Sequence, residues 1–442
     1  MTQGFKRVLG GLDVFFLAFG AMIGWGWVVL AGGWIESAGF LGAAAAFAAG
    51  GVIVSLIGLT YAELASALPY AGGEHVYVER AFGPGASFVA TWAIVLGYVS
   101  VVAFEAIALP TALVYLFPDL RQIPLWDVAG YKVHLTEVLI GSVAALFITG
   151  LNIIGVKAAA LVQKVVILVV LGAGALLISG SVLGAGEISG PMIAGASGVA
   201  GVLMMVPFLF VGFDVIPQSA EEMNVPRRRI GALLIASIVF ATVFYIGVVV
   251  AVGLAPVSAG AAPSTVVTAD AASALWNSEK AGAYIILAGV AGILTSWNAF
   301  LIGGSRAIFA MARAGQLPAF LGRVHPKYGT PHYAIAFIGL LSVLAPVLGR
   351  SALVWIVDAG GFGIPLAYIF VAASFVALRV KAPEMERPYR APAGMIVGWL
   401  AVLLSIGLGA LYLPGSPAGL VWPQEWAIIG GWIVLGALAF GA

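Results

Sequence analysis

The sequence predicts an all-α integral membrane protein with twelve transmembrane helices, and three observations carry this prediction. Of the 442 residues, 62% are hydrophobic and only 9% are charged, a balance outside the range of soluble domains. The apolar residues form long runs of the length that crosses a bilayer. Short turns rich in proline and glycine separate these runs, so nearly all of the chain is expected within the membrane.

Twelve apolar runs are expected to form the spanning helices, each with an uncertainty of a few residues at its ends. The expected spans are 13–35, 39–67, 85–116, 135–155, 160–182, 197–219, 230–255, 282–312, 333–349, 352–378, 394–413 and 425–441.

Lysine and arginine residues are unevenly divided between the two sets of loops. With the N-terminus inside, sixteen of the twenty Lys and Arg residues fall on inner loops or nearby helix ends. The exceptions are Arg121, Lys132, Lys280 and Arg350. Cytoplasmic loops carry this kind of excess. The sequence therefore predicts a multi-pass protein of the cell (plasma) membrane with both termini in the cytoplasm.

Composition also argues against several classes of function. Cysteine is absent, which excludes thiol catalysis and Cys-ligated metals, and the four histidines lie far apart, so no metal site is predicted. A net charge of +1 argues against nucleic acid binding. No catalytic triad and no Gly-x-x-x-x-Gly-Lys-Ser/Thr loop is present, which argues against an enzyme and an ATP-driven pump.

The first apolar run contains three glycines within seven residues, Gly20, Gly24 and Gly26. Glycine is a poor helix residue, and it leaves backbone groups open to neighbours. Within a membrane, open backbone is tolerated where protein or a water-filled cavity receives it. The stretch therefore indicates either a helix break around residues 24–26 or a Gly-x-x-x-Gly helix contact.

The sixth run is interrupted in a similar way, by Gly212 next to Phe213 and Asp214. Spans one and six start five spans apart, so a 5+5 repeat places its halves in opposite orientations. Two interrupted helices at matching positions of inverted halves indicate a substrate site at the bilayer midplane. The expected organisation is a transporter core over 1–390, with repeats at about 10–185 and 195–380, and two additional helices over 391–442.

The two breaks supply complementary backbone groups. N–H groups and a positive helix end at the first break suit a carboxylate. Freed carbonyls at the second break would accept hydrogen bonds from an ammonium group. A zwitterionic amino acid satisfies both, whereas an amine without a carboxylate uses the second only. The substrate-binding candidates on the backbone are Ile23, Gly24, Trp25, Gly26, Phe208, Leu209 and Val211.

Two acids lie inside apolar spans, where acids are costly and often functional. Asp214 is a substrate-binding candidate, with local capping of the broken helix as the alternative. Glu105 lies in the middle of the third span without a basic neighbour in sequence, and is the candidate proton carrier, with a structural hydrogen bond as the alternative. Glu63 and Glu74, at the inner end of span two, are expected to make gate or loop contacts, and Glu221 or Glu222 to pair with nearby arginines in an inner gate.

Aromatic side chains are also expected near the site. An aromatic lid over a substrate ammonium would gain cation–π attraction, although packing is the simpler role for each ring. Phe208 is the preferred gate because it directly precedes the proposed carbonyls, and Trp297 is a further substrate-binding candidate.

Three stretches of sequence carry a family resemblance. Residues 61–84 contain YAELASALPYAGGE followed by FGP, residues 212–228 contain GFD and AEEMNVPRR, and residues 305–318 run from SR to MARAGQLP. These stretches resemble the second, sixth and eighth helices of the amino acid–polyamine–organocation (APC) superfamily. The resemblance implies a five-plus-five inverted-repeat fold with two further helices. It also implies a substrate carboxylate at the first break and the amine at the sixth helix.

Two departures from the family's pattern bear on the site. The family commonly has serine between the first-helix glycines, where this sequence has Trp25. Proton-coupled relatives place a lysine in the fifth helix, at a position that falls at about Val170 here, and Lys164 lies nearly two turns earlier. The usual lysine coupling is therefore not supported, which makes Glu105 the more interesting acid.

We interpret the chain as a secondary active transporter, or permease, that moves a small or medium neutral amino acid by alternating access. No cofactor is expected; a proton is the candidate coupling ion, and sodium stays open. The competing interpretation is an amine or polyamine permease. A transporter-like sensor or a channel fits less well, because a signalling domain and repeated pore-lining polar residues are missing. The expected partners are the small-molecule substrate and the lipid bilayer.

Overall fold

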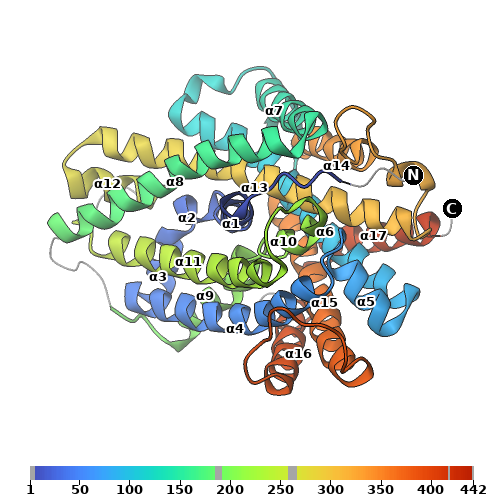
Figure 1. The fold of residues 1–442 in the computed structure, drawn as a ribbon. Helices are drawn as coiled ribbons and strands as arrows, with labels where there is room; N and C mark the ends of the chain where they lie inside the picture. Colours follow the sequence, from blue (N-terminus) through green and yellow to red (C-terminus); the bar gives the residue numbers. More distant parts are fainter. Residues whose placement is uncertain (1–4, 185–191, 257–265, 417–418, 441–442) are drawn as a thin grey trace.

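The computed structural model describes residues 5–184, 192–256, 266–416 and 419–440, and these are almost entirely helical (Figure 1). Seven helices are long and apolar enough to cross a membrane. They are α4 (Phe40–Ala67), α6 (Pro84–Leu116), α7 (Leu135–Ile154), α8 (Val156–Leu183), α11 (Arg227–Gly253), α13 (Glu279–Arg313) and α15 (Ala352–Lys381).

Five shorter apolar helices complete the set that matches the expected runs. They are α1 (Gly11–Met22), α9 (Ala196–Leu209), α14 (His332–Leu344), α16 (Met395–Ala410) and α17 (Gln424–Ala439). A 3-10 turn, η4 (Ala345–Leu348), extends α14. The first and sixth expected runs are not continuous helices: α2 (Gly26–Val29) and α3 (Ala31–Ala38) follow α1, and α10 (Val215–Gln218) follows α9.

The connections contain more structure than the sequence indicated. Helices α5 (Glu74–Phe82) and α12 (Val267–Trp276) and the 3-10 turns η1 (Pro118–Leu120), η2 (Ala220–Glu222) and η3 (Ala319–Gly322) lie between the long helices. A two-stranded antiparallel hairpin of β1 (Pro124–Val128) and β2 (Tyr131–His134) joins α6 to α7. The Trp126 indole donates a hydrogen bond of 3.0 Å to the Val347 carbonyl, which attaches the hairpin to η4.

Helix α1 occupies the centre of the bundle. Figure 1 shows it nearly end-on between α8, α11 and α13, and it packs against all three. The pairs α4–α11, α6–α15 and α6–α13 form the most extensive helix contacts around it. Helices α16 and α17 lie outside this core, where α16 packs against α15 and α4, and α17 against α15. The central position of α1 explains why its interruption is buried.

A glycine turn between α4 and α5 brings distant polar groups together. Gly72 and Gly73 have φ angles of +97° and +37°, which side chains with a Cβ rarely adopt. The N–H group of Gly72 donates a 3.2 Å hydrogen bond to the carbonyl of Gln218 in α10. The turn therefore starts α5 directly against the second half of the interrupted sixth segment.

Candidate functional site

The first helix is interrupted at residues 23–25, where the glycine pattern indicated a break. Among the described residues, no backbone carbonyl accepts a hydrogen bond from the N–H groups of Gly24, Trp25 or Gly26. Two carbonyls near the end of α1 have side-chain partners: the Thr295 hydroxyl donates to Gly20 at 3.0 Å, and the Tyr245 hydroxyl donates to Met22 at 2.8 Å. The interruption therefore offers free donors.

The second interruption lies between the end of α9 at Leu209 and the start of α10 at Val215. Gly212 has a φ of +127°, and its N–H donates a 2.7 Å hydrogen bond to the Asp214 carboxylate. A Cβ on Gly212 would lie 3.0 Å from the carbonyl carbon of Ala21, and a Cβ on Gly26 would lie 3.0 Å from Leu209 Cδ2. The two interruptions are therefore in contact with each other.

The second break lies in the turn around Gly212, where the sequence placed the interruption. Phe208 and Leu209 are still part of α9, and Val211 lies in the turn. The Phe208 carbonyl already accepts a 3.4 Å hydrogen bond from the Val211 N–H. Pro207 lies within the helix and does not end it, because a proline removes only its own N–H and the bond to the carbonyl four residues back. The gate candidate Phe208 is half-buried and packs against the core.

Glu105 of α6 lies at the first interruption. Its carboxyl accepts a hydrogen bond from the Ser296 hydroxyl of α13, and its Oε2 atom has no partner among the described groups. A Cβ on Gly24 would lie 2.9 Å from Glu105 Oε1 and 3.1 Å from Ser296 Oγ. Glu105 itself is only 2% exposed. The fold therefore brings a buried acid next to the free N–H groups of the break.

Trp25, which stands where the family commonly has serine, packs away from Glu105. The indole lies on Gly289 of α13, where a Cβ would be 2.5 Å from its Cε3 atom, and it is 6% exposed. Gly292, one turn further on, lets α13 approach the break, since a Cβ there would lie 3.0 Å from the Ile23 carbonyl oxygen. Trp297 is also buried in the core. These contacts give Trp25 a packing role against α13.

Sequence reasoning missed a chain of buried amides behind the first interruption. Asn152 of α7 donates to the side-chain carbonyl of Asn298 at 2.9 Å, and Asn298 donates to Gln163 of α8 at 2.9 Å. Gln163 in turn donates to the Phe16 carbonyl of α1 at 3.4 Å. Amide side chains inside membrane spans often join helices. The asparagines and the glutamine within the expected spans were therefore the sequence signal for this chain. The chain links α7, α13 and α8 to α1.

The fifth-helix lysine position is apolar in the structure as well. Val170 is 1% exposed and belongs to the core. Lys164 pairs with Asp13 near the start of α1, with an N···O distance of 2.6 Å. Lys164 therefore pairs near the N-terminal end of α1 rather than at its interruption.

Two further buried acids pair with arginines. Glu222 pairs with Arg306 of α13 at 2.6 Å, rather than with the arginines of its own loop as the sequence suggested. Its main-chain carbonyl also accepts hydrogen bonds from Val8 and Leu9, at 2.9 and 3.0 Å. The ion pair therefore joins α13 to the loop after α10 and to the segment before α1.

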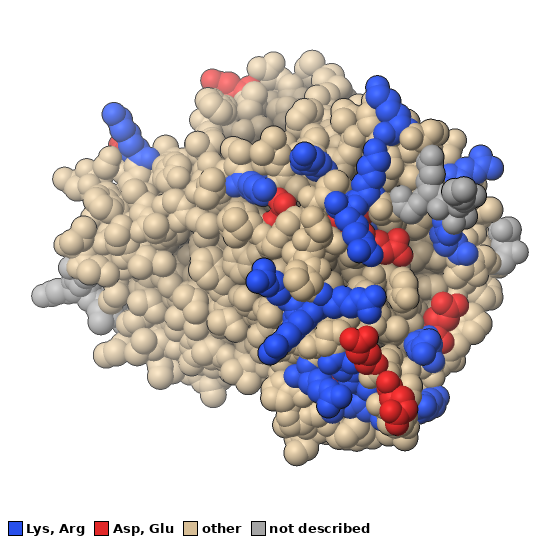
Figure 2. All heavy atoms as spheres, in the orientation of Figure 1, with Lys and Arg blue, Asp and Glu red and all other residues tan. Residues whose placement is uncertain are grey.

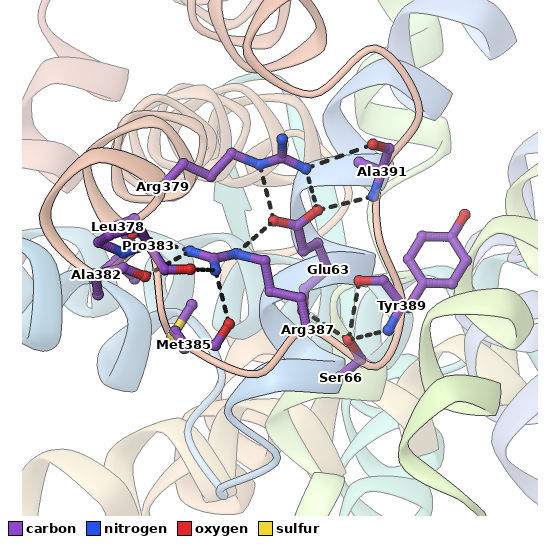
Figure 3. Close-up of polar contacts among 10 residues, drawn as sticks. All are labelled: Glu63, Ser66, Leu378, Arg379, Ala382, Pro383, Met385, Arg387, Tyr389 and Ala391. Atoms are coloured by element: carbon purple, nitrogen blue, oxygen red, sulfur yellow. Dashed lines mark hydrogen bonds and ion pairs between the residues drawn. The ribbon is translucent and has the colours of Figure 1, made fainter.

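Glu63, near the C-terminal end of α4, forms the other pair (Figure 3). It binds Arg379 of α15 at 3.0 Å and 2.5 Å, and Arg387 at 3.1 Å. The Ala391 N–H donates a further 2.8 Å hydrogen bond to the same carboxylate. These contacts fasten α4 to α15 and to the segment that leads into α16.

Figure 2 shows that most visible Lys and Arg side chains gather over the half of the molecule that holds α5, α10 and α16.

A bundle of long apolar helices is typical of a multi-pass membrane protein, and two of its segments are interrupted where they contact each other. The model of the amino acid permease family matches residues 9–438. The chain belongs to this family. It is a transporter and not an enzyme, and it acts in amino acid transport.

Curated relatives cover most of the chain. A branched-chain amino acid permease, BcaP, of Bacillus subtilis (strain 168) is 26% identical over 92% of this chain and 88% of its own. A methylthioribose transporter of the same organism is 26% identical over 99% of this chain and 94% of its own. Cationic amino acid transporter 1 of Arabidopsis thaliana is 29% identical over 79% of this chain and 60% of its own.

Proposed function

We propose that this permease is a secondary active transporter that moves a small or medium neutral amino acid across the cell membrane by alternating access. In this proposal the seven long and five shorter apolar helices are twelve spans in a 5+5 inverted repeat with two further helices, and both termini are cytoplasmic. The observation that carries the proposal is the contact between the two interruptions, with free N–H groups at residues 24–26.

The free N–H groups are the seat for the substrate carboxylate. Backbone donors at the start of a helix bind anions because their partial positive charge is not neutralised within the chain. The predicted amine seat includes the backbone of Val211, which lies in the turn of the second interruption. An amino acid would therefore bridge the first half of the protein to the second.

Glu105 supplies a physical link between substrate and proton. A substrate carboxylate at the Gly24 N–H would lie beside Glu105 Oε1. Two like charges about 4 Å apart repel by roughly 4 kcal/mol at a protein-like dielectric. Protonation of Glu105 removes this repulsion, so proton binding and amino acid binding favour each other.

The same geometry favours one alternative, an amine permease. An ionised Glu105 next to the first break would attract an ammonium group and repel a carboxylate. Uptake of leucine against that of its decarboxylated analogue isoamylamine, in proteoliposomes, separates the two. Uptake of leucine alone supports the amino acid site, and uptake of the amine alone overturns it.

The Gly26→Leu variant tests the site itself. A side chain at residue 26 would meet Leu209 Cδ2 and fill the contact between the interruptions, so leucine binding should be lost while the protein still inserts. Gly407→Leu is the matched control, because a Cβ at Gly407 meets nothing within 4 Å. Binding is measured by thermal stabilisation of the purified protein. If leucine stabilised both variants equally, the binding site would not lie at the interruptions.

A further inference from the structure

Two further buried acids, separate from Glu105, lie at the contact between α5 and α10. Glu74 is the first residue of α5, and Asp214 directly precedes α10. Both side chains are 0% exposed. We call these two residues the inner acid pair. The glycine turn at residues 72–73 starts α5 against α10, since a Cβ on Gly73 would lie 3.2 Å from the Gln218 nitrogen, and the two carboxyl groups interact electrostatically.

The walls around the inner acid pair carry further oxygen atoms. The side chain of Gln218 donates a hydrogen bond to Glu74 Oε2, and the Gly212 N–H donates to Asp214 Oδ1. Tyrosines from α4, α6 and α15 surround the pair, and their rings pack on each other and on Phe213 or Phe300. The tyrosines that act electrostatically with the pair are Tyr61, Tyr77, Tyr98 and Tyr368.

Many of these oxygen atoms have no hydrogen-bond partner among the described groups. They are Glu74 Oε1, Asp214 Oδ2, Gln218 Oε1 and the hydroxyls of Tyr61, Tyr77, Tyr98 and Tyr368. Buried polar atoms without partners are rare and costly in native proteins. The hydroxyls of Tyr61 and Tyr98 interact with the carboxyl groups of Glu74 and Asp214, so the cluster is a polar pocket built around the two acids.

The charge of the inner acid pair is not balanced by the protein. In the described part of the chain, no cationic side chain pairs with Glu74 or Asp214. Arg306 is held by Glu222, and Arg379 and Arg387 are held by Glu63. On α5 itself, His75 bonds to Gln316 and faces Glu79.

Two adjacent buried carboxylates cannot both stay ionised without a counter-charge. Burial and the nearby Asp214 raise the pKa of the Glu74 carboxyl well above its ordinary value. A single proton shared between the two groups is the smallest occupant that removes the repulsion.

We propose that the inner acid pair is a second proton site, which holds one proton shared between Glu74 and Asp214 and releases it on the side of the membrane where α5 lies. This inference rests on the proposed transport function. The proton binds a carboxylate oxygen and leaves as a solvated proton, so no other reactant is required. Release leaves two anions in contact, which weakens the contact between α5 and α10. The site differs from Glu105, which contacts Gly24 and Ser296 on other helices.

The test uses the full-length protein in proteoliposomes with radiolabelled leucine. Glu74→Gln and Asp214→Asn keep the shape of the site and remove the exchangeable proton. The transport arm uses Glu74→Gln, which should keep counterflow of leucine at equal pH and lose the accumulation that an inward proton gradient drives in the wild type. Glu79→Gln is the matched control on the same helix, because Glu79 is 43% exposed. It should accumulate leucine like the wild type.

Accumulation by Glu74→Gln at the wild-type level would overturn the proton site. Accumulation in the wild type that follows a sodium gradient and ignores a proton gradient would overturn it as well.

An infrared measurement decides the question without transport. At neutral pH the wild type should show the carbonyl stretching band of a protonated carboxyl, and Glu74→Gln should lose it. An unchanged band in Glu74→Gln and in Asp214→Asn would overturn the proposal. Absence of leucine counterflow in the wild type would instead count against the proposed transport function, and the infrared result would still stand.

Discussion

The buried acids of this permease differ in whether a positively charged side chain lies next to them. Glu63 and Glu222 each lie against arginines, in contacts that join separate segments of the chain. Glu105, Glu74 and Asp214 are equally buried, yet each keeps a carboxyl oxygen without a partner among the described residues. A buried acid with a counter-ion holds structure together, whereas one without a counter-ion is available to bind a proton or a substrate group.

Removal of Glu222 should have the largest effect on stability. Glu222→Ala leaves the fully buried Arg306 without a counter-charge, which typically costs about 3–5 kcal/mol. Denaturation of the purified protein measures this loss. Glu221→Ala, at the half-buried neighbouring residue, should cost only about 1 kcal/mol or less. If the two substitutions lowered the free energy of unfolding equally, the ion pair of Glu222 with Arg306 would not contribute to stability as described.

Neutralisation of Glu63 should have a smaller effect. Glu63→Gln keeps the size of the side chain but weakens its contacts to Arg379, Arg387 and the Ala391 N–H, a loss of about 1.5–3 kcal/mol. Glu384→Gln, an exposed acid in the segment after α15, is the control and should leave stability unchanged. A Glu63→Gln protein as stable as the wild type would show that the contacts in Figure 3 do not fasten α4 to α15.

Neutralisation of Glu105 should change stability least and binding most. Glu105→Gln keeps an acceptor for Ser296 and leaves no buried cation unpaired, so stability should stay within about 1 kcal/mol. In the wild type, leucine binding should strengthen as pH falls and Glu105 takes up a proton. In the variant this rise should be absent. Thermal stabilisation by leucine across pH measures both, and an unchanged pH dependence would return Glu105 to a structural role.

Some features of the site could be predicted from sequence because they depend on residue types within a short stretch of chain. Glycines at residues 24 and 26 indicated the first interruption, and an acid in an apolar run marked Glu105 and Asp214. Gly212 indicated the second interruption, which lies in the turn between α9 and α10.

Features set by packing between distant helices could not be predicted. Ser296 lies 191 residues from Glu105, and Arg306 lies 84 residues from Glu222. Only the packing of α13 against α6 and α1 brings Ser296 to the break. The glycine turn before α5 was visible in the sequence, but its contact with α10 was not, so Glu74 was interpreted as a gate or loop residue.

The most direct test of the central claim is the thermal stabilisation of the purified wild-type protein by leucine and by isoamylamine, each at two pH values with and without sodium. A ligand that binds the folded state raises its stability by mass action. If the free N–H groups at residues 24–26 hold a carboxylate, leucine should raise the unfolding temperature and isoamylamine should not, with the larger shift at the lower pH. A shift with isoamylamine alone would contradict the carboxylate seat and make the chain an amine permease.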